Sequence, residues 1–149
     1  MDNLTPAQRS RTMSLIRSKD TRAELRIRGL LHARGLRFRK HVRSLPGQPD
    51  LVFVKAKVIV FVDGDYWHGW RFPQWRDKLA SYWKQKIEGN RRRDRGNSRK
   101  LRREGWLVIR VWEHQVEDDA DRCVDHIHAA VRLRVRTPSL AATKRTQRP

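Results

Sequence analysis

Residues 58–70 read VIVFVDGDYWHGW, and this stretch decides the fold that we predict. Its first five residues are β-branched or aromatic and predict a buried strand. A similar run, residues 51–54, lies just before it, and the short Lys-Ala-Lys segment between the two runs indicates a hairpin. Such a hairpin places Asp50, at the start of one strand, close to Asp63, at the end of the other.

The other elements follow from hydrophobic periodicity on either side of this hairpin. Apolar residues at helical spacing predict three helices, and short apolar runs predict two more strands. The expected helices cover residues 23–35, 77–104 and 120–135, the strands 38–42, 51–54, 58–62 and 107–112, and a loop 64–73. The order α-β-β-β-α-β-α predicts an α/β fold with a mixed central sheet and flanking helices.

The charge of the chain indicates a nucleic-acid partner. Its 149 residues include 35 Lys and Arg against 16 Asp and Glu, a formal net charge of +19. A chain this basic is typical of proteins that bind a polyanion, most often nucleic acid. No apolar run approaches the length of a membrane span, which excludes a transmembrane protein. The single cysteine excludes an internal disulfide and favours the cytoplasm.

The basic residues are distributed unevenly along the chain. We expect one folded domain, residues 20–135, between a basic N-terminal arm, residues 1–19, and a disordered basic tail, residues 136–149. The tail interpretation rests on a terminal stretch without acids that carries Arg134, Arg136, Lys144, Arg145 and Arg148. The arm is expected to contact DNA.

Asp50 and Asp63 form the first candidate site. Two carboxylates at one sheet edge are the oxygen ligands that Mg²⁺ prefers, and such a metal activates water for phosphodiester cleavage. Asp is also common in turns at strand ends. Spacing alone leaves both interpretations open.

The aromatic loop holds the second candidate. Tyr66, Trp67 and Trp70 surround His68, ahead of a basic helix. Exposed aromatics there are suited to stacking on bases or insertion between them, and His68 is suited to general base catalysis. The alternative is that the aromatics fill the core, which we favour for Trp70, and that His68 caps a backbone group.

The predicted helix 77–104 supplies the third candidate. Asp94 lies on the same stripe as apolar residues that should face the core, so its carboxylate needs a partner. That partner is either His68, which Asp94 would orient, or one of the arginines beside it. Arg92 and Arg99 belong to a densely basic stretch and are expected to contact phosphates.

Glu24 also has two interpretations. With Thr21 it has the spacing of a capping box at the start of the first helix. Alternatively, it reaches from that helix to the sheet edge at Asp50.

Taken together, these motifs resemble the very-short-patch-repair (Vsr-type) endonucleases, which share the PD-(D/E)xK nuclease core. The resemblance covers roughly residues 8–130, and several ordered motifs are more specific than any one of them. The matching residues are 9–13, 21–24, 45–50, 60–64, 66–69, Trp83, 86–87, Asn90, 93–94, 105–106 and 111–113.

The resemblance implies a role for each candidate residue. Family members use Mg²⁺ to nick one DNA strand 5′ to the thymine of a T·G mismatch. Asp50 matches the central metal ligand and the backbone carbonyl of Val62 a second ligand. His68 matches the catalytic histidine, Asp94 its supporting acid and Glu24 the remaining acidic residue. The wedge that intercalates beside the mismatch is matched by Met13, Tyr66 and Trp67.

The chain departs from the family pattern in two places. The lysine of the (D/E)xK motif is absent, since Asp65 stands there, which suits the histidine-based version. The family's structural zinc is expected to be absent, because Asp65 and His114 occupy two ligand positions and the others are missing. We predict that Asp65 and His114 are still neighbours and brace the aromatic loop, with Trp70 packing against them.

We therefore predict a Mg²⁺-dependent DNA-nicking endonuclease of Vsr type that acts on double-stranded, mismatched DNA and leaves 5′-phosphate and 3′-hydroxyl ends. One alternative is a restriction-like or mobile-element nuclease without mismatch specificity, working with a separate specificity or repair partner. Another is a non-catalytic nucleic-acid-binding module. The expected location is the bacterial cytoplasm, at the nucleoid, with no membrane association.

Overall fold

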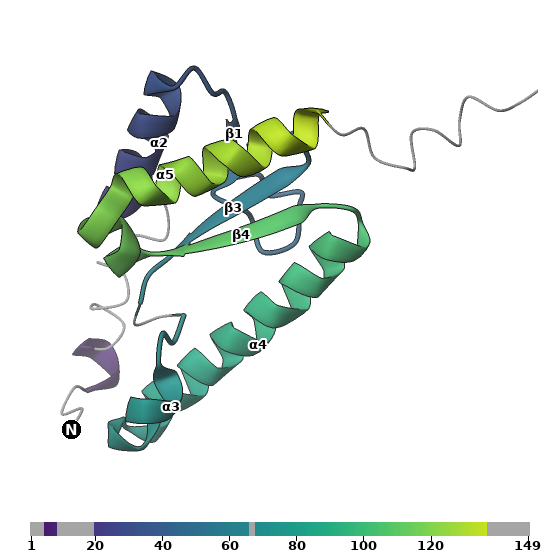
Figure 1. Ribbon diagram of the computed structural model, residues 1–149. Helices are drawn as coiled ribbons and strands as arrows, with labels where there is room; N and C mark the ends of the chain where they lie inside the picture. The colour runs from purple at the N-terminus through teal and green to yellow at the C-terminus, as the bar shows by residue number, and fades with distance from the viewer. Residues whose placement is uncertain (1–4, 9–19, 66–67, 137–149) are drawn as a thin grey trace, which may run out of the picture.

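The computed structural model describes residues 5–8, 20–65 and 68–136, which form a mixed four-stranded sheet with helices on both faces (Figure 1). This confirms the predicted α/β class. In chain order the elements are α2 (Arg22–Ala33), β1 (Arg39–Lys40), β2 (Leu51–Phe53), β3 (Val58–Asp63), α3 (Phe72–Trp75), the 3₁₀ helix η1 (Arg76–Lys78), α4 (Ser81–Arg103), β4 (Leu107–Trp112) and α5 (Glu113–Arg136).

The sheet has the order β1-β2-β3-β4. The predicted hairpin is confirmed, because β2 and β3 pair antiparallel with Leu51 opposite Val60. β3 and β4 pair in parallel from Val58 and Leu107 to Asp63 and Trp112. The first strand is shorter than the predicted 38–42, since His41 has a φ of 47° and so cannot continue it.

Alternate side chains of β3 pack on opposite faces of the sheet. Val58 and Val60 join the larger core, which α2 and α5 cover, while Ile59 and Phe61 join a smaller core with Leu101 of α4. By this alternation Asp63, the last residue of β3, lies on the α4 side. Figure 1 shows α5 and α4 on opposite sides of the sheet, with the N-terminal half of α4 extending away from the strands.

The predicted loop and helix around residues 64–104 need correction. α3 and η1 form within the segment expected to be loop or the first turn of the long helix, and α4 begins only at Ser81. The break lies at Leu79 and Ala80, whose ψ angles of 148° and 147° are extended. Pro73, in the first turn of α3, is compatible with a helix start but not with a helix interior.

The C-terminal helix also differs from its prediction. α5 begins at Glu113 rather than at Ala120, with a kink at Asp119, and ends at Arg136. Arg134, one of the basic residues on which the tail interpretation rests, therefore lies within α5, and its side chain donates hydrogen bonds to the carbonyl oxygens of Ala56 and Gly105 at 3.1 and 2.7 Å.

Two further expectations bear on the ends of the chain and on membranes. Most of the predicted arm and the predicted tail beyond Arg136 lie outside the described residues. None of the helices formed by the described part of the chain has the length and apolar character needed to cross a membrane.

Candidate active site

A cavity of about 680 Å³ brings together most of the predicted catalytic and metal-binding residues. It opens between the end of β3, the loop after it, the segment between β1 and β2, and the middle of α4. Its lining includes the predicted residues Asp50, Val62, Asp63, His68 and Asp94, together with His41, Arg43, Gly47, Gln48, Phe61, Asn90, Arg93 and Asn97.

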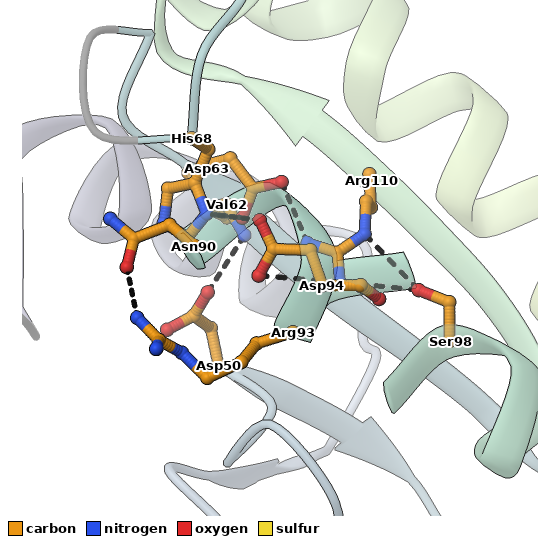
Figure 2. Close-up of polar contacts among 9 residues, drawn as sticks. All are labelled: Asp50, Val62, Asp63, His68, Asn90, Arg93, Asp94, Ser98 and Arg110. Atoms are coloured by element: carbon orange, nitrogen blue, oxygen red, sulfur yellow. Dashed lines mark hydrogen bonds and ion pairs between the residues drawn. The ribbon is translucent and has the colours of Figure 1, made fainter. Parts of the chain in front are cut away.

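The hairpin positions Asp50 against the end of β3. Asp50 precedes β2, and the antiparallel register carries its side chain across to the neighbouring strand. The backbone N–H of Val62 donates a hydrogen bond to Asp50 Oδ2 at 2.7 Å (Figure 2). The predicted proximity of the start of one strand to the end of the other is thus confirmed.

The surroundings of Asp50 disfavour its own negative charge. Burial raises the pKa of this carboxyl, and the charges of Glu24 and Asp63 raise it further. The Val62 hydrogen bond and His68 act in the opposite direction, and the resulting pKa is about 7. A bound cation would relieve this crowding of acids, and a carboxylate beside a backbone carbonyl is an oxygen donor set suited to Mg²⁺. The residues present therefore fit the metal that the family resemblance implies.

His68 is held by Asp94 of α4. Its Nδ1 lies 2.7 Å from Asp94 Oδ2 and 3.8 Å from Asp63 Oδ1, so the predicted contact between His68 and Asp94 is confirmed (Figure 2). Burial opposes the imidazolium, but the hydrogen bond to Asp94 and the charges of Asp63 and Asp94 outweigh it and raise the pKa of His68. The contact engages Nδ1, which leaves Nε2 as the nitrogen that can exchange a proton with substrate or water.

Asp63 takes a different partner from the one that its predicted role suggests. Its carboxylate is almost fully buried, and Arg110 Nη1 donates to Asp63 Oδ2 at 2.8 Å. The same guanidinium donates to Ser98 Oγ at 3.2 Å and to the backbone carbonyl of Asp94 at 3.3 Å (Figure 2). Arg110 of β4 thus connects β3 and α4.

Sequence reasoning missed Arg110. The one available signal was a single cation inside the otherwise apolar run LVIRVW, residues 107–112. Such a residue needs a buried acid or a solvent-facing edge.

Glu24 lies behind the cavity, where it contacts His41. The Thr21 half of the predicted cap is present, since Thr21 Oγ1 accepts from the Glu24 N–H at 3.2 Å. The Glu24 carboxylate, 2 % exposed, lies 2.5 Å from His41 Nε2. It is also close enough to Asp50 to raise the pKa of that carboxyl. Glu24 therefore faces the sheet edge, as the second interpretation expected.

Asp20 completes a small cluster with Glu24 and His41. Their potential ligand atoms all lie within 4.8 Å of one another, close enough to hold a metal ion. Within the described residues, no other group of three or more His, Cys, Asp and Glu side chains meets this condition. Arg28 already supplies a positive charge there, 2.9 Å from Asp20 Oδ1. Neither predicted metal ligand, Asp50 or Val62, belongs to this cluster, and sequence reasoning did not identify Asp20 or His41.

The loop that carries His68 is attached to the start of α5. His114 Nδ1 lies 2.7 Å from Asp65 Oδ1, and the centroid of the Trp70 ring lies 4.0 Å from that of the His114 ring, with the two planes tilted by 44°. The predicted contact of Asp65, His114 and Trp70 is confirmed. It links the loop to the first turn of α5, where the backbone N–H of His114 also donates to Asp65 Oδ1 at 3.4 Å.

The remaining predicted residues are spread more widely. Arg99 lines a second cavity, of about 670 Å³, together with Asp63, His68 and Asp94. Arg92 lines a different hollow beside Phe72. The predicted wedge residues Met13, Tyr66 and Trp67 lie outside the described residues.

Comparison with known proteins yields one family. Residues 1–74 match the family model described as DNA mismatch endonuclease Vsr. The chain is 42% identical over 135 residues to the type II nicking enzyme V.NmeDIP of Neisseria meningitidis serogroup C, an alignment that covers 89% of this chain and 91% of that protein. It is 44% identical over 119 residues to the type II nicking enzyme V.XorIIP of Xanthomonas oryzae pv. oryzae, covering 78% and 88%. It is 38% identical over 112 residues to the DNA mismatch endonuclease Vsr of Escherichia coli, covering 72% and 70%.

Proposed function

Because the chain belongs to the Vsr family of DNA mismatch endonucleases, we propose that it nicks double-stranded DNA at or near a T·G mismatch, with Mg²⁺ as cofactor. The observation that carries the proposal is the placement of Asp50, His68 and Asp94 in one cavity. A pure binding module of net charge +19 would gain nothing from gathering carboxylates and an imidazole in this way.

The carboxylate of Asp50 and the backbone carbonyl of Val62 would hold the Mg²⁺ ion. When bound, the ion supplies Lewis-acid stabilisation of the charge that develops on the phosphate and lowers the pKa of a nearby water. Glu24, fixed by His41, adds negative charge behind Asp50 and so strengthens the preference of this position for a cation.

His68 is the general base in this proposal. In this role Nδ1–H of His68 donates a hydrogen bond to the Asp94 carboxylate, which leaves the free electron pair of Nε2 available in the cavity. Nε2 removes a proton from the attacking water, and Asp94 and Asp63 stabilise the imidazolium that forms. Attack of the resulting hydroxide on phosphorus breaks the P–O3′ bond, and the departing 3′ oxygen takes a proton from solvent water, which leaves 5′-phosphate and 3′-hydroxyl ends.

Recognition of the mismatch is assigned to the aromatic loop and the N-terminal arm. Tyr66 and Trp67 would insert beside the mismatch with Met13, as the family resemblance implies, because aromatic and apolar wedges unstack base steps. The contact of Asp65 with His114 supports this role, since it anchors the loop from which the wedge extends.

A cleavage assay tests the proposal. Intact duplexes containing T·G, other mismatches or only matched pairs are incubated with the protein and either Mg²⁺ or EDTA. We expect nicking of the T·G duplex with Mg²⁺ and none with EDTA. Equal nicking of all duplexes would support a nuclease without mismatch specificity. If no duplex is nicked, the proposal that the protein is a DNA-nicking enzyme is rejected.

Variants connect that activity to the site. Asp50→Ala should abolish nicking and leave DNA binding intact or tighter, because it removes a negative charge near the phosphate. Asp121→Ala, which removes an exposed carboxylate from α5, is the matched control and should nick normally. Full activity of Asp50→Ala would reject Asp50 as a metal ligand.

A further inference from the structure

The arginines of α4 divide into sets that face different sides of the helix. Arg91, Arg95, Arg99 and Arg102 follow one another at spacings of four, four and three residues, which places them on one side. All of them line the cavity of about 670 Å³, whose other lining residues are Asp63, His68, Asp94, Ser98, Arg110 and Trp112. We call this surface the arginine groove.

The positive charge of the arginine groove is largely uncompensated. Its acids already have partners, since Asp63 pairs with Arg110 and Asp94 contacts His68. Within residues 5–8, 20–65 and 68–136, none of the α4 arginines of the groove forms an ion pair with a carboxylate. Like charges this close repel one another unless an anion lies between them.

The dimensions of the groove fit a chain of phosphates better than a single small anion. At a rise of about 1.5 Å per residue, the helix from Arg91 to Arg102 is about 16 Å long. A single phosphate would contact only part of this row, whereas a nucleic-acid backbone presents phosphates along its whole length.

The arginine groove is also continuous with the candidate active site. Asp63, His68 and Asp94 line both cavities, so the groove begins at the proposed general base. We propose that the arginine groove binds the phosphate backbone of the cleaved DNA strand on one side of the scissile bond. This inference rests on the proposed nuclease function and adds to it the path of the strand.

Two double variants with the same loss of charge test the groove. Arg95→Gln with Arg99→Gln removes two groove cations. Lys100→Gln with Arg103→Gln removes two exposed cations that the groove does not include. Binding to a fluorescent duplex is measured by anisotropy in EDTA across a salt series, and thermal melting verifies that both variants are folded.

We expect the groove variant to reduce the slope of log affinity against log salt by roughly two, since each phosphate contact contributes about 0.9. The control variant should change the slope by much less. Replacement of the same groove positions by Lys should restore most of the slope, because charge is retained. Equal reductions of the slope in the two Gln variants would show that only total charge matters. That result would overturn the proposal that the arginine groove binds the DNA backbone.

Cleavage kinetics separate this inference from the proposed function. With Mg²⁺ the groove variant should raise KM while kcat stays within about twofold, because backbone contacts bind ground and transition states alike. If the wild type nicks DNA but the two Gln variants behave alike, the proposed role of the arginine groove is rejected and the proposed nuclease activity is retained. If the wild type does not nick DNA but the salt-dependence slopes of the two variants differ as expected, the arginine groove is retained as a nucleic-acid-binding site and the proposed nuclease activity is rejected.

Discussion

At the scale of single residues, the contact between His68 and Asp94 decides which imidazole nitrogen can accept a proton. Nδ1 is engaged at 2.7 Å, so Nε2 alone is available. The same contact raises the pKa of His68, which means that a larger share of the histidine is protonated near neutral pH. A general base must be neutral, and its pKa therefore sets the acidic limb of the pH–rate profile.

Asp94→Asn should move the acidic limb of the pH–rate profile toward lower pH. The variant removes the carboxylate that raises the pKa of His68, so the imidazole becomes neutral at a lower pH, while poorer orientation lowers the maximal rate by about tenfold or more. Nicking rates are measured from pH 5.5 to 9 at saturating Mg²⁺, where bound metal keeps Asp50 ionised. A limb that stays at the wild-type pH would contradict the assignment of His68 as the base.

Arg110→Met should destabilise the fold through Asp63. The substitution leaves an almost fully buried carboxylate without its 2.8 Å partner, which costs about 1–3 kcal/mol. Adding Asp63→Asn removes the unpaired charge and should recover part of that loss. Urea denaturation of both single variants and the double variant measures the coupling. Strictly additive effects would mean that the ion pair contributes nothing to stability.

At the scale of elements, the aromatic loop depends on its close approach to α4. Gly69, which follows His68, is buried with a φ of 73°. A Cβ there would lie 2.7 Å from Arg91 Cδ and 3.0 Å from Ile87 Cγ2. Only glycine combines this backbone conformation with this spacing, so the position of His68 relative to Asp94 depends on it.

Gly69→Ala should therefore lower both stability and kcat. Alanine at a positive φ costs about 1 kcal/mol or more, and the clash with α4 displaces the adjacent His68. Gly96→Ala is the matched control, because Gly96 lies within α4 with nothing near its Cβ position. It should stabilise the protein by about 1 kcal/mol without slowing nicking. Similar melting temperatures for the two variants would contradict the close approach.

At the scale of the whole molecule, the crowding of acids around Asp50 links metal, pH and stability. The pKa of Asp50 is about 7 in the folded protein, well above the ordinary value of 3.8 for this side chain. The folded state therefore binds a proton more tightly than the unfolded chain does, and the associated stability declines as pH rises through about 7. A raised pKa of His68 gives a decline in the same direction.

Asp50→Asn should make the metal-free protein more stable than the wild type at pH 8. The amide keeps an acceptor for the Val62 N–H and removes the charge that this position disfavours. Melting in EDTA at pH 6 and pH 8 should show a smaller decline for the variant, and Mg²⁺ should stabilise only the wild type. Asp121→Asn is the control. Equal stabilisation of Asp50→Asn by Mg²⁺ would place the metal elsewhere, for example at Asp20, Glu24 and His41.

Features that arise from local patterns and near neighbours could be predicted from the amino-acid sequence. The hairpin that brings Asp50 to Val62 follows from two β-branched runs joined by a tight turn, and the start of the first helix follows from Thr21. The resemblance of ordered motifs to one family made Asp65 and His114 predictable neighbours, although 49 residues separate them. These inferences succeeded because periodicity, turn chemistry and motif order are properties of the chain itself.

The long-range partners of the buried charges, in contrast, depend on how the strands and helices pack in three dimensions. The ion pair of Asp63 and Arg110 spans 47 residues and exists because β3 and β4 pair in parallel with a register that no local pattern specifies. The same pairing places α4 so that Arg99 lines the arginine groove and Arg92 does not. Sequence shows that these arginines share a helix, but the side that faces the site depends on how that helix packs on the sheet.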